Sequence, residues 1–500
     1  MKKGQVILVG AGPGDPELLT VKGRKAIESA EVVVYDRLVG REILNLIPDS
    51  AERINVGKES SHHTVPQEEI NQILLQKALE GKQVIRLKGG DPFLFGRGGE
   101  ELELLSAHGV PFQEIPGITS AIAVPAYAGI PVTHRDCCSS LHIVTGHQRA
   151  GTPLNINFEA LVQTKGTLVF LMGVSALQEI CKGLLCAGMS PDMPAAVIEK
   201  GTTPFQRSIL APLSALPETG KAAHVKSPAI IVVGKVCAYA PQFDWFGHLP
   251  LNGKTVIVTR PKERAGTLSD RLRALGANVV EFPCIETQPF LPCPEMEEAV
   301  DNISRYEWLA FTSPAGVSAL MELLHRTGRD VRALGAIKLA AIGTGTDREL
   351  RKHGLHADLI PSVYDGAHLG EALCQENPTG KVLILRAEWG TQAFTDALDA
   401  HTIAYDDIRC YETRYTAANT EEVRTLLIPG TIVTFTSAST VTGFIRALGE
   451  DTDFSAITAA CIGRQTEAEA SKYNLHTITA EQATIDALIQ KIMEGESPWN

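Results

Sequence analysis

The first half of the chain is best understood from residues 6–23, which read VILVGAGPGDPELLTVKG. The apolar residues 6–9 predict a buried strand, and the glycines after them predict a tight loop. A dinucleotide-binding loop would need a further glycine where Asp15 stands. Pro13 also lacks the backbone N–H that a pyrophosphate would need. The loop therefore favours a ligand without phosphate over NAD.

Two more glycine-containing loops follow apolar segments. Residues 87–101 read LKGGDPFLFGRGGEE, and residues 116–121 read PGITSA. Glycines allow the backbone to approach a ligand closely, and Asp91 offers a carboxylate acceptor. A sulfonium-bearing amino-acid nucleoside would suit such loops, because its ammonium and ribose hydroxyls need acceptors and it carries no phosphate. Three loops of this kind, each after a strand, predict a ligand cleft.

Length and composition limit the classes of function. A chain of 500 residues predicts two to four domains. Its net charge of -12 argues against non-specific binding to nucleic acid or to an anionic membrane. The sequence has no apolar stretch of the roughly 20 residues that span a bilayer, and its apolar start is too short for a signal peptide. We expect no partner of either kind.

The cysteines and histidines point to neither disulfides nor metal. The ten cysteines contain no Cys-x-x-Cys pair, and the paired histidines lack other ligands at metal-site spacing. We therefore expect reduced thiols, no metal and a cytoplasmic protein.

Strand-like and helix-like segments alternate throughout, which predicts α/β domains. Residues 237–253 lack this periodicity and divide the chain into nearly equal halves. The second half repeats three patterns in the same order, which predicts two related α/β lobes and a cleft between them, unless short strand-turn-helix units are alike by chance. The repeated patterns are GKTVIV at 253–258 and GKVLIL at 380–385, FTS at 311–313 and 435–437, and IG-x-x-T at 342–346 and 462–466.

Residues 1–245 resemble the uroporphyrinogen-III C-methyltransferases. The first loop and the GGDPF motif at 89–93 also occur in diphthine synthase and in ribosomal-RNA ribose methylases, but YDRL at 35–38 together with THR at 133–135 points to the tetrapyrrole member. The resemblance implies a two-lobed tetrapyrrole-methylase fold, S-adenosylmethionine as methyl donor and a homodimer formed through this half.

The resemblance also implies roles for particular residues. Asp36 and Lys58 match a proton acceptor and a proton donor; without the resemblance, Asp36 would be taken as a helix N-cap after the strand at 32–35. The substrate has eight carboxylates, and their recognition calls for cations. We expect these cations to be Arg37, Arg97, His134 and Arg135. The implied cofactor contacts are Pro13, Gly89, Gly90, Asp91, Leu94, Thr119, Ser120, Met172 and Gly201, where the family often has isoleucine in place of Leu94 and alanine in place of Ser120.

In its arrangement of motifs the second half resembles uroporphyrinogen-III synthase, a bilobal enzyme without a cofactor. The loss of periodicity predicts a linker at 246–252. The resemblance implies a synthase domain at 253–500, with lobe one formed by 253–288 plus 413–500 and lobe two by 289–412. Tyr411 would supply a proton, unless it is an ordinary half-buried strand tyrosine. The hydroxyls expected to hold substrate carboxylates are those of Ser313, Thr346, Ser437 and Thr466, the last three placed on loops.

Together the two resemblances imply a bifunctional enzyme of tetrapyrrole biosynthesis. It would cyclise hydroxymethylbilane to uroporphyrinogen III with loss of water. It would then methylate that product at C2 and C7 to precorrin-2, on the way to sirohaem or cobalamin. Two alternatives remain: a methylase whose second half is a non-catalytic ligand sensor, and a methylase of another substrate such as diphthine or a cobalt-corrin intermediate.

Overall fold

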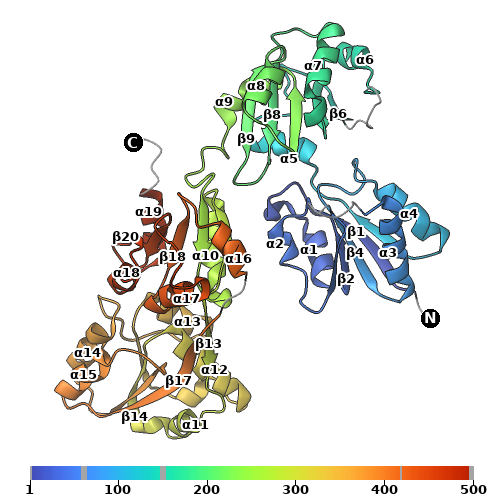
Figure 1. Ribbon diagram of the computed structural model, residues 1–500. Helices are drawn as coiled ribbons and strands as arrows, with labels where there is room; N and C mark the ends of the chain where they lie inside the picture. Colours follow the sequence, from blue (N-terminus) through green and yellow to red (C-terminus); the bar gives the residue numbers. More distant parts are fainter. Residues whose placement is uncertain (1–2, 58–64, 147–153, 417–418, 495–500) are drawn as a thin grey trace. The chain divides into compact units, whose positions relative to one another are not determined.

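The computed structural model of the chain describes residues 3–57, 65–146, 154–416 and 419–494 (Figure 1). It divides into two compact units, Met1–Gly253 and Lys254–Asn500, and each is described by itself. Both units consist of β-sheets covered by helices, so the predicted α/β fold is confirmed. Among the described residues, none of the helices has the length and apolar character that crossing a membrane requires.

The first sheet of unit 1 is entirely parallel, with the order β3-β2-β4-β1-β5. Along β1, Ile7 and Val9 join one apolar cluster, while Val6 and Leu8 join another. Both faces of the sheet are therefore buried, which is why β1 is continuously apolar. The elements of this lobe are β1 (Gln5–Gly10), α1 (Val21–Glu28), β2 (Val32–Tyr35), α2 (Arg41–Leu44), β3 (Glu52–Asn55), α3 (Gln67–Leu79), β4 (Gln83–Lys88), α4 (Gly98–Ala107) and β5 (Phe112–Ile115).

The second sheet of unit 1 is mixed, with the order β6-β7-β10-β8-β9. Of its neighbouring strand pairs, only β6–β7 is parallel. Helix α5 packs on one face of this sheet, and α7 and α8 pack on the other. The elements are α5 (Ser120–Tyr127), β6 (Leu141–Thr145), α6 (Phe158–Gln163), β7 (Thr167–Leu171), α7 (Leu177–Cys186), β8 (Pro194–Glu199), β9 (Arg207–Pro212), α8 (Leu216–Ala222), β10 (Ala229–Val233) and α9 (Ala240–Phe243).

The segment expected to be a linker, 246–252, packs onto unit 1. Phe246 and Leu251 are buried, and the ring of Tyr127 lies 4.9 Å from the rings of both Trp245 and Phe246. The lack of periodicity that suggested a linker reflects short turns rich in aromatic residues, whose side chains contribute to the core of this unit.

Unit 2 contains two five-stranded sheets. One is entirely parallel, with the order β12-β11-β18-β19-β20. Its apolar core includes Phe282, Phe435 and Phe444. Its elements are β11 (Thr255–Val258), α10 (Lys262–Ala274), β12 (Asn278–Glu281), α16 (Thr420–Thr425), β18 (Ile432–Phe435), α17 (Ala438–Leu448), β19 (Thr458–Cys461), α18 (Arg464–Ser471), β20 (His476–Thr479) and α19 (Ile485–Glu494).

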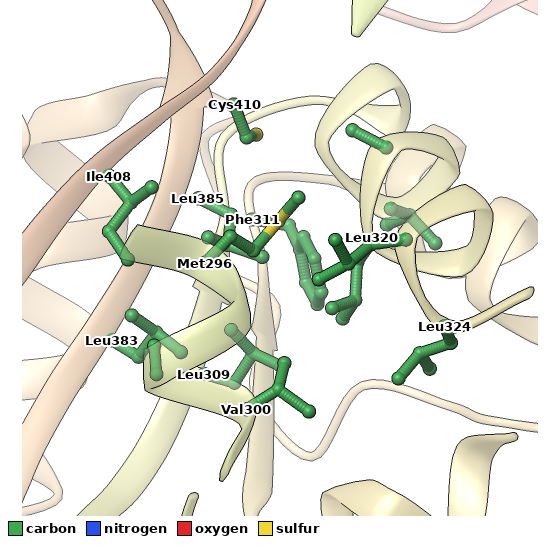
Figure 2. Close-up of a cluster of buried hydrophobic side chains, with 14 of the residues drawn as sticks. Met296, Val300, Leu309, Phe311, Leu320, Leu324, Leu383, Leu385, Ile408 and Cys410 are labelled. Carbon is green, nitrogen blue, oxygen red and sulfur yellow. The ribbon is translucent and has the colours of Figure 1, made fainter. Parts of the chain in front are cut away.

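The other sheet of unit 2 has the order β13-β17-β16-β14-β15, with only β13 antiparallel. Figure 2 shows part of its core, where Met296 of α11 and Leu320 of α12 lie beside Leu309, Phe311 and Leu385 of the sheet. Its elements are β13 (Ile285–Pro289), α11 (Pro294–Asp301), β14 (Tyr306–Phe311), α12 (Pro314–Arg326), β15 (Lys338–Ala341), α13 (Thr344–Lys352), α14 (Gly366–Gln375), β16 (Lys381–Ala387), α15 (Ala393–Ala400) and β17 (Tyr405–Tyr415).

The sequence repeats and the two sheets do not coincide. The first repeat supplies β11 to one sheet and β14 and β15 to the other, while the second supplies β16 to the latter and β18 and β19 to the former. Matching turns have matching geometry, since the N-caps Ser313 and Ser437 have φ, ψ of -165°, 161° and -167°, 161°. Each sheet is therefore assembled from parts of both repeats, whereas the repeats alone suggested one lobe each.

Candidate functional site

In unit 1 the three glycine loops meet at the carboxyl edge of the parallel sheet. The Gly90 amide donates to the Gly12 carbonyl at 2.7 Å, and the Gly12 amide donates to the Gly90 carbonyl at 3.2 Å. A Cβ on Gly117 would lie 2.1 Å from the Gly90 oxygen, so no side chain fits there. A Cβ on Gly90 would meet no atom within 4 Å. The loops thus pack against one another and leave open space beside Gly90, as a bound nucleoside would require.

Asp91 holds two of these loops together. One oxygen of its carboxylate accepts from the amides of Phe93 and Leu94, both at 2.9 Å, and the other accepts from the Gly117 amide at 3.1 Å. The sequence indicated Asp91 as an acceptor for a ligand. The structure gives its oxygens three backbone donors, so the carboxylate organises the loops.

The other expected cofactor residues come from both lobes of unit 1. Thr119 caps α5, whose first residue is Ser120, and Gly201 lies against the same helix, since a Cβ there would be 2.2 Å from Val124. Leu94 packs against the apolar cluster that contains α5 residues. Met172 follows β7, is half exposed and has a φ of 56°. Pro13 and Gly89 lie in the first and second loops.

Two hydrogen bonds join the lobes at this edge. The Asp15 amide donates to Thr202 Oγ1 at 3.2 Å, and the Tyr127 hydroxyl donates to the Asp15 carboxylate at 2.6 Å. Burial and the hydrogen bond to Asp15 raise the pKa of Tyr127 well above its usual value. Asp15, the residue that argued against a dinucleotide, thus serves as an acceptor between the lobes.

Asp36 lies in the turn after β2 and is not a helix cap. Its carboxylate accepts from the Leu38 amide at 3.0 Å and lies 3.9 Å from Nη2 of Arg86. The next helix, α2, begins at Arg41 with Gly40 as its N-cap, so the alternative of a helix N-cap is wrong. The Asp36 side chain is 27% exposed. Lys58, the other residue with an implied proton-transfer role, lies outside the described residues.

The four cations expected to bind substrate differ in their surroundings. Arg37 and Arg135 are exposed. Arg97 is held by Glu100, with two contacts of 2.8 and 2.6 Å that raise the pKa of the guanidinium. The ring of His134 lies 4.7 Å from the ring of Tyr239. To bind a substrate carboxylate, the Arg97 guanidinium must therefore either release Glu100 or contact both carboxylates at once.

In unit 2 the hydroxyls of Tyr411 and Ser313 are 2.7 Å apart. Ser313 is the N-cap of α12 and accepts from the amides of Ala315 and Gly316. Tyr411 is 7% exposed, so it is more buried than the half-buried strand tyrosine considered from the sequence. It lines a hollow of about 220 Å³ with Pro289, its cross-strand partner, and with residues of α12. That volume is below the range of typical ligand pockets, so the hollow would hold only part of a tetrapyrrole.

The placement of two expected carboxylate-binding hydroxyls on loops is wrong. Thr346 and Thr466 are buried in the first turns of α13 and α18. Gly343 and Gly463 are the N-caps of these helices, so each helix begins before the threonine. Ser437 remains at a helix start: it caps α17 and lies 2.9 Å from Ser439 Oγ.

Three of the buried charged residues lie together and were missed in the sequence: Arg86 and Lys88 of β4, and Glu101 of α4. Charged residues at alternate positions of the otherwise apolar VIRLK segment were the signal that could have revealed the first two. Within the described part of the chain, no group of three or more His, Cys, Asp or Glu side chains is arranged to hold a metal ion.

Comparison with known proteins defines the class of each half. Residues 5–217 match the tetrapyrrole (corrin/porphyrin) methylases, and residues 266–490 match uroporphyrinogen-III synthase HemD. The chain therefore joins a tetrapyrrole methylase to a synthase of the HemD type, and the resemblance seen in the sequence is confirmed.

Several curated relatives extend this match. The porphyrin biosynthesis protein HemD of Ruminiclostridium josui is 48% identical over 497 residues, covering 99% of this chain and 98% of that protein. The uroporphyrinogen-III C-methyltransferase of Bacillus subtilis is 42% identical, covering 71% and 72%. A crystal structure of the uroporphyrin-III C-methyl transferase of Thermus thermophilus, complexed with S-adenyl homocysteine, is 41% identical with a TM-score of 0.41, covering 47% of this chain and 99% of that chain. The protein belongs to the family of fused methylase–synthase enzymes of porphyrin biosynthesis.

Proposed function

We propose that this enzyme converts hydroxymethylbilane to uroporphyrinogen III and then methylates that product twice, at C2 and C7, to give precorrin-2. The observation that carries the proposal is the presence of both families in one chain. The product of the synthase reaction is the substrate of the methylase reaction, so both substrates are small tetrapyrroles. The assignment of the methylase to residues 1–245 and of the synthase to residues 253–500, with the two lobes expected above, is part of the proposal.

We propose S-adenosylmethionine as the methyl donor, held where the three loops of unit 1 meet. Its sulfonium supplies an electrophilic methyl group. Open space beside Gly90 and the close packing of the loops support binding of a nucleoside there. A pyrrole carbon of the porphyrinogen is the nucleophile, so the site chiefly has to align the two reactants.

Asp36 is the residue proposed to stabilise the positive charge that develops in this step. Attack by the pyrrole carbon leaves a cationic ring, which an adjacent carboxylate stabilises. Loss of the pyrrole N–H proton then restores neutrality, and Asp36 is the candidate acceptor. Its partial exposure and its place in a turn rather than in a helix cap support this role. Lys58 and the four cations named above complete the proposed substrate site.

In the synthase half Tyr411 is the proposed proton donor. The C–O bond of the hydroxymethyl group breaks, and the leaving hydroxide takes the proton of Tyr411 and departs as water. The cationic carbon left behind bonds to ring D, which becomes inverted, and the proton released on ring closure returns to the Tyr411 oxygen. The hydrogen bond between Tyr411 and Ser313 supports a defined orientation of the phenol. Ser437 is the proposed partner of a substrate carboxylate, and this step requires no cofactor.

A homodimer formed through the methylase half and a cytoplasmic location are also proposed. All ten cysteines are free thiols, which supports a reducing compartment. The alternative to the synthase reaction is that the second half is a bilobal ligand sensor without catalytic activity.

One experiment tests both halves in the intact protein. The full chain is incubated with hydroxymethylbilane, with or without S-adenosylmethionine. The product isomers are then separated, and their masses are measured by mass spectrometry. We expect the type III isomer without the donor, and a product heavier by two methyl groups with it. Spontaneous closure gives the type I isomer, so type I alone would favour the sensor, and an unmethylated product would refute the methylase assignment.

A further inference from the structure

A cluster of buried charged side chains lies next to Asp36 of the proposed methylation site. Arg86 and Lys88 project from the same face of β4, and their side chains are 3% and 5% exposed. Arg86 Nε lies 3.1 Å and Lys88 Nζ 2.8 Å from the same oxygen, Oε1 of Glu101. Glu101 is fully buried, and the amide of Gln67 donates to the same oxygen at 3.2 Å. Two buried cations thus share one carboxylate oxygen.

This sharing leaves the cluster with an excess positive charge. Nη1 of Arg86 donates to the carbonyls of Val34 and Leu87, and its Nη2 lies 3.9 Å from Asp36 Oδ2. A buried cation without a counter-ion is strongly unfavourable. Asp36 therefore serves as the second anion, and it is the member of the cluster that reaches solvent.

The charges of the cluster act on one another. Burial, and next the neighbouring charge of Arg86, lower the pKa of Lys88, while Glu101 and Asp36 act in the opposite direction. Arg86, Glu101 and Asp36 act on Lys88 from within the cluster, and Lys88 also interacts with the exposed Glu100. Arg86 lies between the two carboxylates, with Nε 3.1 Å from Glu101 Oε1 and Nη2 3.9 Å from Asp36 Oδ2.

We infer that Arg86, Lys88 and Glu101 are positioning residues that fix the place and the negative charge of Asp36 during methylation. This rests on the proposed function, in which Asp36 faces a substrate with eight carboxylates. That much negative charge would favour protonation of any carboxylate nearby. The buried cations Arg86 and Lys88 counter this effect. Glu101 partly neutralises them, and so limits how strongly they attract Asp36 towards the protein interior.

The test compares two substitutions in the full chain, supplied with uroporphyrinogen III and S-adenosylmethionine. Lys88→Met removes a cation, so the acid side of the methylation pH–rate profile should move to higher pH. The rate should therefore fall on the acid side and change little near the optimum. Glu101→Gln removes the competing anion, so the same limb should move to lower pH. Lys88→Arg keeps the charge and should keep the profile.

Opposite shifts in the two variants cannot come from a shared loss of stability. If both variants lower the rate equally at every pH, the cluster is structural and the inference is wrong. If Lys88→Met does not fold, the direction in which the acid limb of the profile moves in Glu101→Gln decides between the inference and a purely structural role. Affinity for S-adenosylhomocysteine, measured by calorimetry, should stay within about twofold in each folded variant. Asp36→Asn distinguishes failure of this inference from failure of the proposed function. Full activity of that variant would refute the proposed role of Asp36 itself.

Discussion

The hydroxyl of Tyr411 lies 2.7 Å from Ser313 Oγ although β16 separates the strands that lead to them. Ser313 Oγ accepts from the amides of Ala315 at 3.1 Å and Gly316 at 3.4 Å. Either hydroxyl can donate in this pair. Because two amides already donate to Ser313 Oγ, donation from Ser313 to the Tyr411 oxygen is compatible with the two lone pairs of the serine. The helix cap thereby fixes the place of the proposed proton donor.

We expect Tyr411→Phe to lower the rate of type III uroporphyrinogen formation by about 10²-fold, the lower end of the usual contribution of a general acid. Ser313→Ala should lower it less, because the phenol remains. The serine variant should also lose about 1 kcal/mol of stability through its helix cap. Isomer-resolved kinetics and thermal melting measure both effects.

Methylation provides the control for these two variants. When uroporphyrinogen III is supplied, both should methylate it at the wild-type rate. A Tyr411→Phe variant that forms the type III isomer at full rate would contradict the role given to the phenol.

Gly117→Ala should abolish cofactor binding. The new Cβ would lie 2.1 Å from the Gly90 oxygen and 2.6 Å from Gly10 Cα, all within backbone that has no room to move. Gly99→Ala is the matched control, because a Cβ there meets nothing within 4 Å in the first turn of α4. It should bind normally and gain about 0.5–1 kcal/mol of stability. Calorimetry with S-adenosylhomocysteine compares the two, and equal affinities would contradict the three-loop site.

Asp91→Ala should weaken cofactor binding by disordering loops rather than by removing a contact to the ligand. Three backbone amides lose their acceptor, which costs about 1–3 kcal/mol for each one left buried and unpaired. The melting temperature of unit 1 should therefore fall together with the affinity. Asp91→Asn keeps one acceptor oxygen and should lie between wild type and alanine. Lost affinity at an unchanged melting temperature would instead indicate direct contact with the ligand.

Much of the fold could be predicted because buried parallel strands are continuously apolar. Val256 to Val258 and Val382 to Leu385 were recognised for this reason, and both are buried. The short motifs do not encode the splitting of each repeat between two sheets, since strand pairing is a long-range property. The expected lobes, 253–288 plus 413–500 and 289–412, divide the repeats in this way, but those bounds came from the resemblance to the synthase family and not from the repeats. Thr346 was misplaced because a glycine N-cap resembles a continuing loop in sequence.

The loops of the methylase site were predictable, but the buried acid Glu101 next to Arg86 and Lys88 was not. Gly90 and Asp91 lie in a distinctive motif whose glycines are needed for close backbone packing. Glu101 lies in a helix beside the exposed Glu100, and nothing in the sequence distinguishes the buried acid from the exposed one. Only the packing of α4 against β4 brings Glu101 to Arg86 and Lys88.

The stability of unit 2 should depend on pH through His368. Its Nδ1 lies 2.8 Å from the carboxylate of Asp365, which also accepts the His368 amide as the N-cap of α14. The hydrogen bond to Asp365, and then the charge of that carboxylate, raise the pKa of His368 above its usual 6.5. A raised histidine pKa means that the protonated form is stabilised in the folded state. This contribution is full below about pH 6.5 and is lost as the pH rises through the folded-state pKa. We expect an NMR titration to place the folded-state pKa of His368 above 6.5. We also expect the melting temperature to fall less in His368→Gln than in the wild type as the pH rises from below 6.5 to above that folded-state pKa. A titration midpoint at or below 6.5 would mean that the pair does not form in solution.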